Sequence, residues 1–428
     1  MNTFILETLK DTKYCCERIS KYWKKKNKGL IIVLDNMDQL RPELQDISFL
    51  NANEIAKKLS CLVIISMREE RFYNAKSKGV LDAYMSPGFH ITSPVIPEVI
   101  SKRIQYAVKK LSAKVDKRRE IGIPDEATFS KIKDFFLVCN NETKRKGSDL
   151  SKFLRYSTHG DVRQALDFFK GFIQSGYTNI NEISSDTNWK LQSHQVIKPM
   201  MIPSRFFYSE VKSKMPNLFQ LRNDANSSHF CGLRILNLLN TKSHDKSSAG
   251  MYDLKFLIQK FENDYNLKID CINHLDIFLT KGIIEANNRL EEYSENVDQV
   301  KITSFGKYML DSLAFDFTYL DLISLDCGIF DEALANFMIK SANKEVELYH
   351  EKKFFERINT RLNRVDKFID YLKVQEDKEF QDLGFGDEEI RFSKKIRDHF
   401  EIKKKQILRS VKNKEYYDSL NNPELPFE

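Results

Sequence analysis

The chain has 428 residues, of which 41% are hydrophobic and 30% are charged, and its formal net charge is +7. This length suffices for two to four domains with a substantial core. The chain contains no run of about 18 apolar residues, and its N-terminal segment is a poor match to a signal peptide. We therefore expect a cytoplasmic protein with no membrane partner. The positive charge is too dispersed to indicate a nucleic-acid partner by itself.

The seven cysteines are scattered along the chain without a C-x-x-C pair. An odd and dispersed set is typical of reduced thiols rather than of disulfides or zinc ligands. Cys271 and His274 form the one Cys/His pair at a ligand-like spacing, and no second pair completes a zinc site. We expect no metal bound by Cys or His.

Two short apolar runs predict neighbouring parallel strands. A helix is expected at 3–25, a strand at 30–34, a helix around 50–60 and a second strand at 61–66. Short runs of β-branched residues and Leu are typical of strands that are buried on both faces. The sequence therefore predicts one right-handed β-α-β unit. A third short extended segment, 89–92, precedes a helix at 98–112.

The following stretch changes to helical periodicity. We expect helices at 125–139, 148–157 and 160–175, with Asp161 as the N-cap of the last one. Residues 176–225 are rich in Ser, Asn and Pro and show little periodicity, which predicts a connector.

A second module begins near residue 229. Three helices, at 230–239, 252–263 and 269–280, precede a two-stranded ribbon formed by 282–286 and 299–303. Three helices followed by a ribbon are typical of a winged helix-turn-helix. Beyond residue 318 the sequence is helical and charged, apart from a turn at 384–386.

Two carboxylates, Asp35 and Asp38, follow the first predicted strand. Open parallel sheets bind ligands at the carboxyl ends of their strands. One carboxylate placed there can hold Mg²⁺, and a second can polarise an attacking water. The alternative is a strand that ends in an ordinary polar turn, with one Asp capping the next segment.

The sequence Val-Leu-Asp-Asn-Met-Asp-Gln at 33–39 is similar to the Walker B strand of STAND ATPases. Over residues 1 to about 320, the chain resembles an AAA+ or STAND-type P-loop ATPase followed by a winged helix. The resemblance implies that Asp35 ligates Mg²⁺ and that Asp38 orients water, with ATP and Mg²⁺ as cofactors. Asn36 stands where AAA+ proteins usually carry a catalytic Glu.

Two arginines extend the resemblance. Residues 64–68 look like a sensor-1 strand that ends in Arg68, and residues 160–166 resemble a sensor-2 helix in which Arg163 faces the phosphates. Arginine suits both positions because its forked donors match phosphate oxygens. The alternatives are a solvent-facing Arg68 and an Arg163 that is simply a first-turn helix residue.

These assignments predict a multidomain, predominantly helical protein with an α/β portion. Its expected parts are a partial P-loop core with a parallel sheet at 1–112, an all-α lid at 113–176, a connector at 177–225, a winged helix at 226–318 and a C-terminal helical region at 319–428.

The charge of the predicted winged helix argues against DNA reading. Its third helix carries Asp270 and Asp276, and the ribbon tip at 290–298 holds four carboxylates. Because phosphate contacts supply much of the affinity for DNA, an acidic surface favours a structural or protein-interaction role.

A helix at 391–414 is the better candidate for nucleic-acid contacts, which are assigned to Lys403, Lys404, Lys405 and Arg409. The alternative is an ordinary solvated, Lys-rich helix. Two functions follow from the sequence. One is an ATPase-type molecular switch with protein partners or self-association. The other is a non-enzymatic nucleic-acid-binding protein built on a degenerate ATPase scaffold.

The sequence predicts that this polypeptide alone does not hydrolyse ATP. The pattern G-x-x-x-x-G-K-[ST] does not occur, and the one Gly-Lys pair, Gly306-Lys307, is followed by Tyr. Without a P-loop there is no nest of backbone N–H groups for the β-phosphate. Either a truncated or split gene or a degenerate family member would explain this. A phosphate-release assay with Asp38→Asn as control is the test. Mg²⁺-dependent turnover that disappears in the variant would contradict the prediction.

Overall fold

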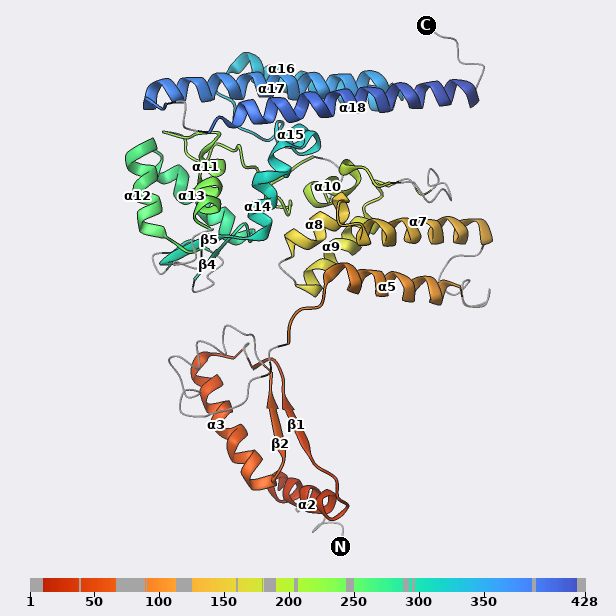
Figure 1. The fold of residues 1–428 in the computed structure, drawn as a ribbon, viewed down its shortest axis with the longest axis vertical. Coiled ribbons are helices and arrows are strands. Elements are labelled where there is room, and N and C mark those ends of the chain that lie inside the picture. Colours follow the sequence, from red (N-terminus) through yellow and green to blue (C-terminus); the bar gives the residue numbers. More distant parts are fainter. Residues whose placement is uncertain are drawn as a thin grey trace. The chain divides into compact units, whose positions relative to one another are not determined.

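The computed structural model describes residues 11–37, 40–66, 89, 91–112, 125–158, 161–178, 180, 190–203, 207–243, 250–287, 292–294, 297–386 and 390–421. The chain divides into two compact units, 1–92 and 93–428, and each is described by itself (Figure 1). The described residues are predominantly helical, as the sequence predicts. None of their helices combines the length and the apolar character needed to cross a bilayer.

The first unit contains a parallel pair of strands. Its elements are α2 (Thr12–Lys25), β1 (Ile31–Leu34), α3 (Pro42–Leu59) and β2 (Leu62–Ile65). Strand β1 pairs with β2 in parallel, with Ile31 opposite Leu62 and Leu34 opposite Ile65. The predicted pairing of two parallel strands across a helix is therefore confirmed.

The expectation that both faces of these strands are buried is wrong. Ile31 and Val33 are 59% and 57% exposed, and their neighbours Leu62 and Ile64 are 57% and 45% exposed. The alternate residues of both strands are half-buried, because the described helices cover that face only. The predicted third extended segment forms no strand over its described residues 89, 91 and 92.

The second unit begins with a helical bundle of α5 (Ile96–Leu111), α7 (Glu126–Lys144), α8 (Asp149–Ser157), α9 (Val162–Gln174) and α10 (Ser193–Met201). Helix α5 buries Ile100 and Ile104 among α7, α8 and α9. This packing places α5 in the second unit, so the units divide near residue 92 and not near 112. Asp161 is the expected N-cap, since its side chain accepts a hydrogen bond from the Gln164 N–H.

The segment that the sequence presents as a connector contributes to the core. Met215, Leu218 and Phe219 are fully buried. The Tyr319 hydroxyl accepts a hydrogen bond from the Leu218 N–H at 2.9 Å and donates one to the Pro216 carbonyl at 2.7 Å. An irregular buried chain has neither the helical nor the strand period, and periodicity therefore could not reveal it.

The next module consists of α11 (Cys231–Lys242), β3 (Tyr252–Asp253), α12 (Leu254–Tyr265), α13 (Lys268–Thr280), β4 (Ile284–Ala286), β5 (Gln299–Ile302) and α14 (Ser304–Asp311). Its sheet is antiparallel, in the order β3-β5-β4. The predicted ribbon is confirmed, with Ile284 opposite Ile302. The short strand β3 was not predicted, because two residues carry no periodic signal.

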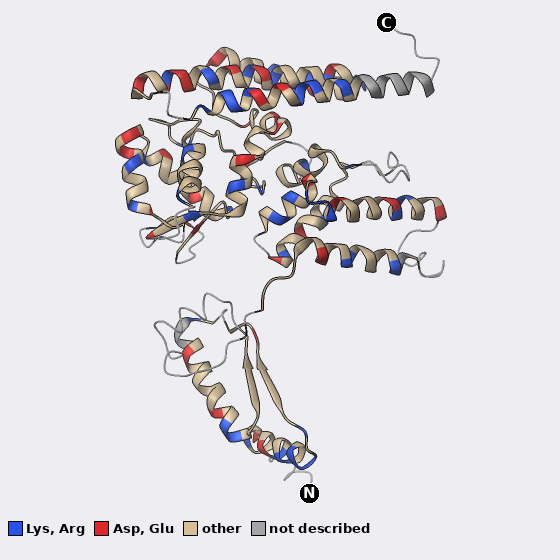
Figure 2. Ribbon diagram, in the orientation of Figure 1, with Lys and Arg blue, Asp and Glu red and all other residues tan. Residues whose placement is uncertain are grey.

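The C-terminal region consists of η4 (Leu313–Phe315), α15 (Phe317–Ile323), α16 (Glu332–His350), α17 (Phe354–Leu383) and α18 (Phe392–Asn421). Acidic and basic residues are interspersed along its long helices (Figure 2). Gly384, at φ 65°, ends α17 in the left-handed region that glycine favours. The Glu376 carboxylate accepts hydrogen bonds from the N–H groups of Phe392 and Ser393, which satisfies the first turn of α18.

A buried charge network joins α15, α16 and α17. Asp321 accepts hydrogen bonds from Arg361 and Arg364, each at 2.6 Å, and Arg364 also binds Glu345 at 2.8 Å. Burial alone would raise the pKa of Asp321, but the two guanidinium groups lower it below its usual value. Because each buried charge is paired, the three helices hold one another in register.

Gly306 and Gly171 form a matched pair for testing the packing of α14. A Cβ at Gly306 would lie 2.3 Å from the Ile283 carbonyl oxygen, whereas nothing lies within 4 Å of one at Gly171 in α9. We expect Gly306→Ala to lower the free energy of unfolding by about 1–3 kcal/mol. Gly171→Ala should raise it by about 0.5–1 kcal/mol. Urea unfolding followed by circular dichroism measures both. Equal effects of the two changes would contradict the close packing of α14 on the ribbon.

Candidate functional site

The carboxyl end of β1 presents Asp35 to solvent. Asp35 Oδ1 accepts a hydrogen bond from the Asn36 N–H at 2.9 Å, and Asn36 has a left-handed φ of 58°. The chain then turns inward, so that Met37 is buried and its N–H donates to the Ser66 carbonyl just beyond β2. This geometry leaves the Asp35 carboxylate accessible to a hydrated cation at the carboxyl edge of two parallel strands.

The structure does not test the other residues of the predicted nucleotide site. Asp38 and Arg68 lie outside the described residues. Arg163 is exposed in the first turn of α9, in the second unit, whereas Asp35 belongs to the first. The roles of all four residues in binding ATP and Mg²⁺ remain predictions.

The four predicted nucleic-acid contacts on α18 differ in their surroundings. The Lys404 ammonium lies 2.7 Å from an Asp366 carboxylate oxygen, and the half-buried Lys403 donates to the Ser193 hydroxyl at 3.3 Å. Lys405 and Arg409 are exposed. Phosphate binding by Lys404 would therefore compete with an existing ion pair. The sequence shows the cations of α18 but not the acidic residues that face them.

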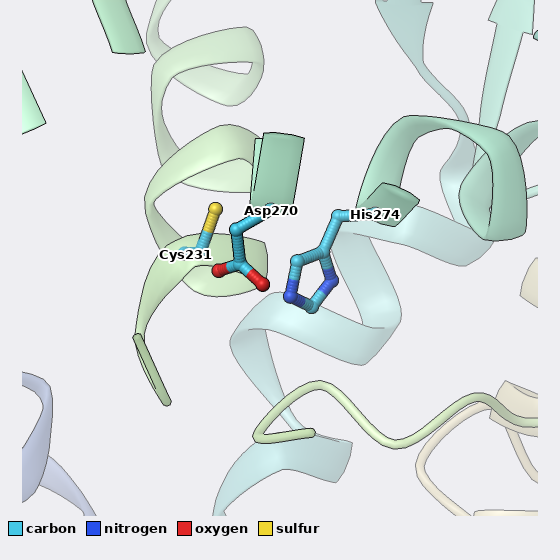
Figure 3. Close-up of side chains that lie close together, drawn as sticks. All are labelled: Cys231, Asp270 and His274. Carbon is cyan, nitrogen blue, oxygen red and sulfur yellow. The ribbon is translucent and has the colours of Figure 1, made fainter. Parts of the chain in front are cut away.

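Three potential metal ligands from two helices meet in the second unit. Cys231 on α11 and Asp270 and His274 on α13 are buried, and their ligand atoms lie within 4.8 Å of one another (Figure 3). Asp270 and His274 are four residues apart and therefore lie on the same face of α13. Sequence reasoning paired His274 with Cys271 instead, because only the fold brings Cys231 to this place.

Arg222 and Asp270 tie the segment before α11 onto α13. Asp270 accepts hydrogen bonds from the Arg222 N–H at 3.0 Å and the Ser228 N–H at 3.2 Å, and a further one from the Ser227 hydroxyl. Burial is the main cause that raises the pKa of Asp270, and these hydrogen bonds partly offset it. The Arg222 guanidinium makes a two-pronged ion pair with Glu210 at 2.6 and 2.9 Å. We call Glu210, Arg222, Asp270 and His274 the α13 clamp.

Arg222 also determines which nitrogen of His274 carries the proton. The Arg222 Nε–H donates to His274 Nδ1 at 3.1 Å, so the neutral ring is protonated at Nε2. Nε2 has no hydrogen-bond partner among the described residues. Burial lowers the pKa of His274 well below its usual value, and the positive charge of Arg222 lowers it further. His274 is therefore neutral at physiological pH.

The donor set of Cys231, Asp270 and His274 would suit zinc, but the surroundings do not. A ligating imidazole must offer a lone pair, whereas the nitrogen of His274 that faces Asp270 in Figure 3 is the one that carries the proton. The Asp270 oxygens already accept three hydrogen bonds. The arrangement fits a structural clamp better than a metal centre.

The polar face of α13 is covered by the protein's own chain. Asn273 donates to the Arg222 carbonyl at 2.7 Å, and Asp276 accepts a hydrogen bond from the Tyr293 N–H at 2.9 Å. Asp270 and His274 are fully buried within the clamp. Nearly every polar side chain that this helix could offer a ligand is thus already engaged. No local pattern signals this, because the bonded partners lie far apart in sequence.

The chain matches no protein-family model, no curated protein and no solved structure.

The two histidines that are buried among the described residues of the second unit should make stability depend on pH. Burial lowers the pKa of His229 to about 4, and His274 also stays neutral in the folded chain. In the unfolded chain both titrate near 6.5. A depressed folded pKa contributes stability that is present above about pH 6.5 and lost as pH falls. We expect the free energy of unfolding to fall by about 2 kcal/mol per histidine between pH 7 and pH 5.

Urea unfolding at pH 7, 6 and 5 measures this loss. His229→Asn removes one titrating group, so its pH dependence should be shallower than that of the unchanged chain, whatever its stability at pH 7. The exposed His350 provides the control, and His350→Asn should leave the dependence unchanged. A pH dependence that is identical in all three proteins would contradict the prediction.

Proposed function

We propose that this chain is a regulatory protein of the AAA+/STAND P-loop ATPase lineage that acts as a molecular switch through contacts with protein partners. The observation behind this proposal is that the polar side chains of α13 are already bonded to other parts of the chain. A winged helix reads DNA with the side chains of its third helix, which must reach the base edges in the major groove. In this chain Asp270, Asn273 and His274 are bonded to residues 222–228.

The order of elements supports the assignment of a winged helix. Helix α11, strand β3, helices α12 and α13, and the ribbon β4–β5 follow one another as in that fold, and α14 packs against the ribbon. Because the α13 clamp fastens the segment before α11 to α13, the module is suited to move as one rigid body when the switch changes state. Its remaining surface is then available for a protein partner or for a second copy of the chain.

The α/β portion supports the ATPase lineage. Strands β1 and β2 are parallel and joined through α3, and Asp35 stands at the carboxyl end of β1. By the family resemblance, Asp35 would hold the metal of a Mg²⁺–nucleotide complex. The phosphate-facing role of Arg163 on α9 is a separate expectation from the same resemblance. We place this switch in the cytoplasm, where ATP is abundant and thiols stay reduced.

The exposed Lys405 and Arg409 favour a second candidate function, nucleic-acid binding through α18. In that case DNA binding should weaken with salt and be abolished when Lys403, Lys404 and Lys405 are changed together. The ion pair of Lys404 with Asp366 counts against it.

Affinity for a fluorescent 20-base-pair DNA duplex tests whether the module reads DNA or acts only through protein contacts. We expect Lys268→Gln combined with Asn273→Ala to change the affinity for the duplex by less than about twofold. The reason is that the Asn273 amide is already bonded to the Arg222 carbonyl and does not contact a base. Reading of the major groove would instead cost about 1–3 kcal/mol for each lost base contact, a loss of affinity of about fivefold or more. Lys109→Gln combined with Asn53→Ala serves as the matched control on other helices.

Hydrogen exchange with and without Mg²⁺–ATP tests the switch itself. We expect protection at residues 31–37 and 162–166, and loss of both effects in Asp35→Asn. No protection at either place, in a chain that remains folded, would contradict nucleotide sensing.

A further inference from the structure

Helix α2 and the turn after it carry a dense basic and aromatic surface. Residues 11–28 contain seven cations against Asp11 and Glu17, a net charge of +5 within a chain of +7. Blue residues gather at this end of the first unit in Figure 2. We define the α2 patch as these cations and three aromatic residues: Lys13, Arg18, Lys21, Lys24, Lys25, Lys26, Lys28, Tyr14, Tyr22 and Trp23.

The aromatic rings of the α2 patch are open to solvent. Tyr14, Tyr22 and Trp23 are 46%, 52% and 36% exposed. Helix α2 packs against α3, where the buried Ser20 donates a hydrogen bond to the Leu59 carbonyl. About half of the surface of each tyrosine and a third of that of Trp23 therefore remain accessible to a ligand.

Each ring shares its surface with a cation. The Lys26 ammonium lies 4.7 Å from the Tyr22 ring centroid, the Lys28 ammonium 5.2 Å from that of Trp23, and the Arg18 guanidinium 5.9 Å from that of Tyr14. All seven cations are exposed, and no ion pair joins any of them to a described carboxylate. The partner that fits this surface is a polyanion with flat groups that can stack.

The interleaving of rings and cations distinguishes between two classes of polyanion. A helix that lies in a membrane surface needs aliphatic and aromatic side chains on one face and its cations on the opposite face. Ile19 is the one exposed large aliphatic side chain on α2, and the three rings have cations beside them. Single-stranded nucleic acid matches this arrangement, because bases stack on aromatic rings while Lys and Arg neutralise the phosphates.

We propose that the α2 patch binds single-stranded nucleic acid, with bases stacked on Tyr14, Tyr22 and Trp23 and phosphates held by the surrounding cations. Tyr14 and Tyr22 are eight residues apart, which separates them by about 12 Å along the helix. Binding of this kind tolerates any base sequence, since every base has a face that can stack. The proposal is independent of the switch and of the basic helix α18.

The test uses the full chain and a fluorescent 20-nucleotide oligo(dT), with anisotropy measured from 50 to 300 mM KCl. The variant Lys26→Gln/Lys28→Gln should weaken binding and reduce the slope of log K against log salt by about 1.4, which is two phosphate contacts. The variant Tyr22→Ala/Trp23→Ala should weaken binding at least about tenfold while leaving the slope unchanged. Lys109→Gln/Lys110→Gln, in the last turn of α5, is the matched charge control and should leave affinity and slope unchanged.

Three results would overturn the proposal. The first is the absence of binding at 50 mM KCl by a chain whose circular dichroism is that of the folded protein. The second is an equal loss in the α2 and α5 variants, which would indicate attraction by net charge alone. The third is tighter binding to vesicles of phosphatidylserine and phosphatidylcholine, reduced by the same α2 changes, which would identify a membrane surface instead. Circular dichroism of each variant separates loss of binding from loss of folding.

Discussion

Arg222 makes the contacts on which the arrangement of the second unit depends. Its guanidinium binds Glu210 and the His274 ring, while its backbone N–H binds Asp270 and its carbonyl binds Asn273. One residue thus satisfies buried polar groups of α13 and fastens the irregular segment before α11 to that helix. Removing either charge of the Arg222–Glu210 pair would leave the other with little solvation, which is costly in a protein interior.

This clamp explains why a module with the element order of a winged helix is a poor candidate for reading DNA. The acidic character of its third helix already argued against phosphate contacts, and the fold adds that its polar side chains are engaged. This is the reason that we propose protein contacts, rather than DNA reading, as the output of the module. The C-terminal helices follow the same principle, because Asp321 and Glu376 use buried carboxylates to fix helix positions rather than to bind a ligand.

The first unit differs in that it leaves apolar and basic surfaces open. Strands β1 and β2 expose the face that carries Ile31 and Leu62, and α2 exposes its rings and cations. Two parallel strands with one uncovered face are a small core, since parallel sheets are usually covered on both sides. The first unit thus leaves apolar and basic faces open, whereas the polar side chains around Asp270 in the second unit are engaged by its own chain.

The sequence by itself determined most of the helices, the two parallel strands, the ribbon and caps such as Asp161, because periodicity and capping are local properties of the chain. It missed α10, which lies within the predicted connector. Only the tertiary structure decided whether the apolar and charged residues lie against solvent or against other side chains. The exposed side of β1, the buried irregular segment around Phe219 and the pairing of Lys404 with Asp366 all depend on residues far apart in sequence. The same holds for His274, whose proton position is fixed by Arg222, a residue that no local pattern connects to it.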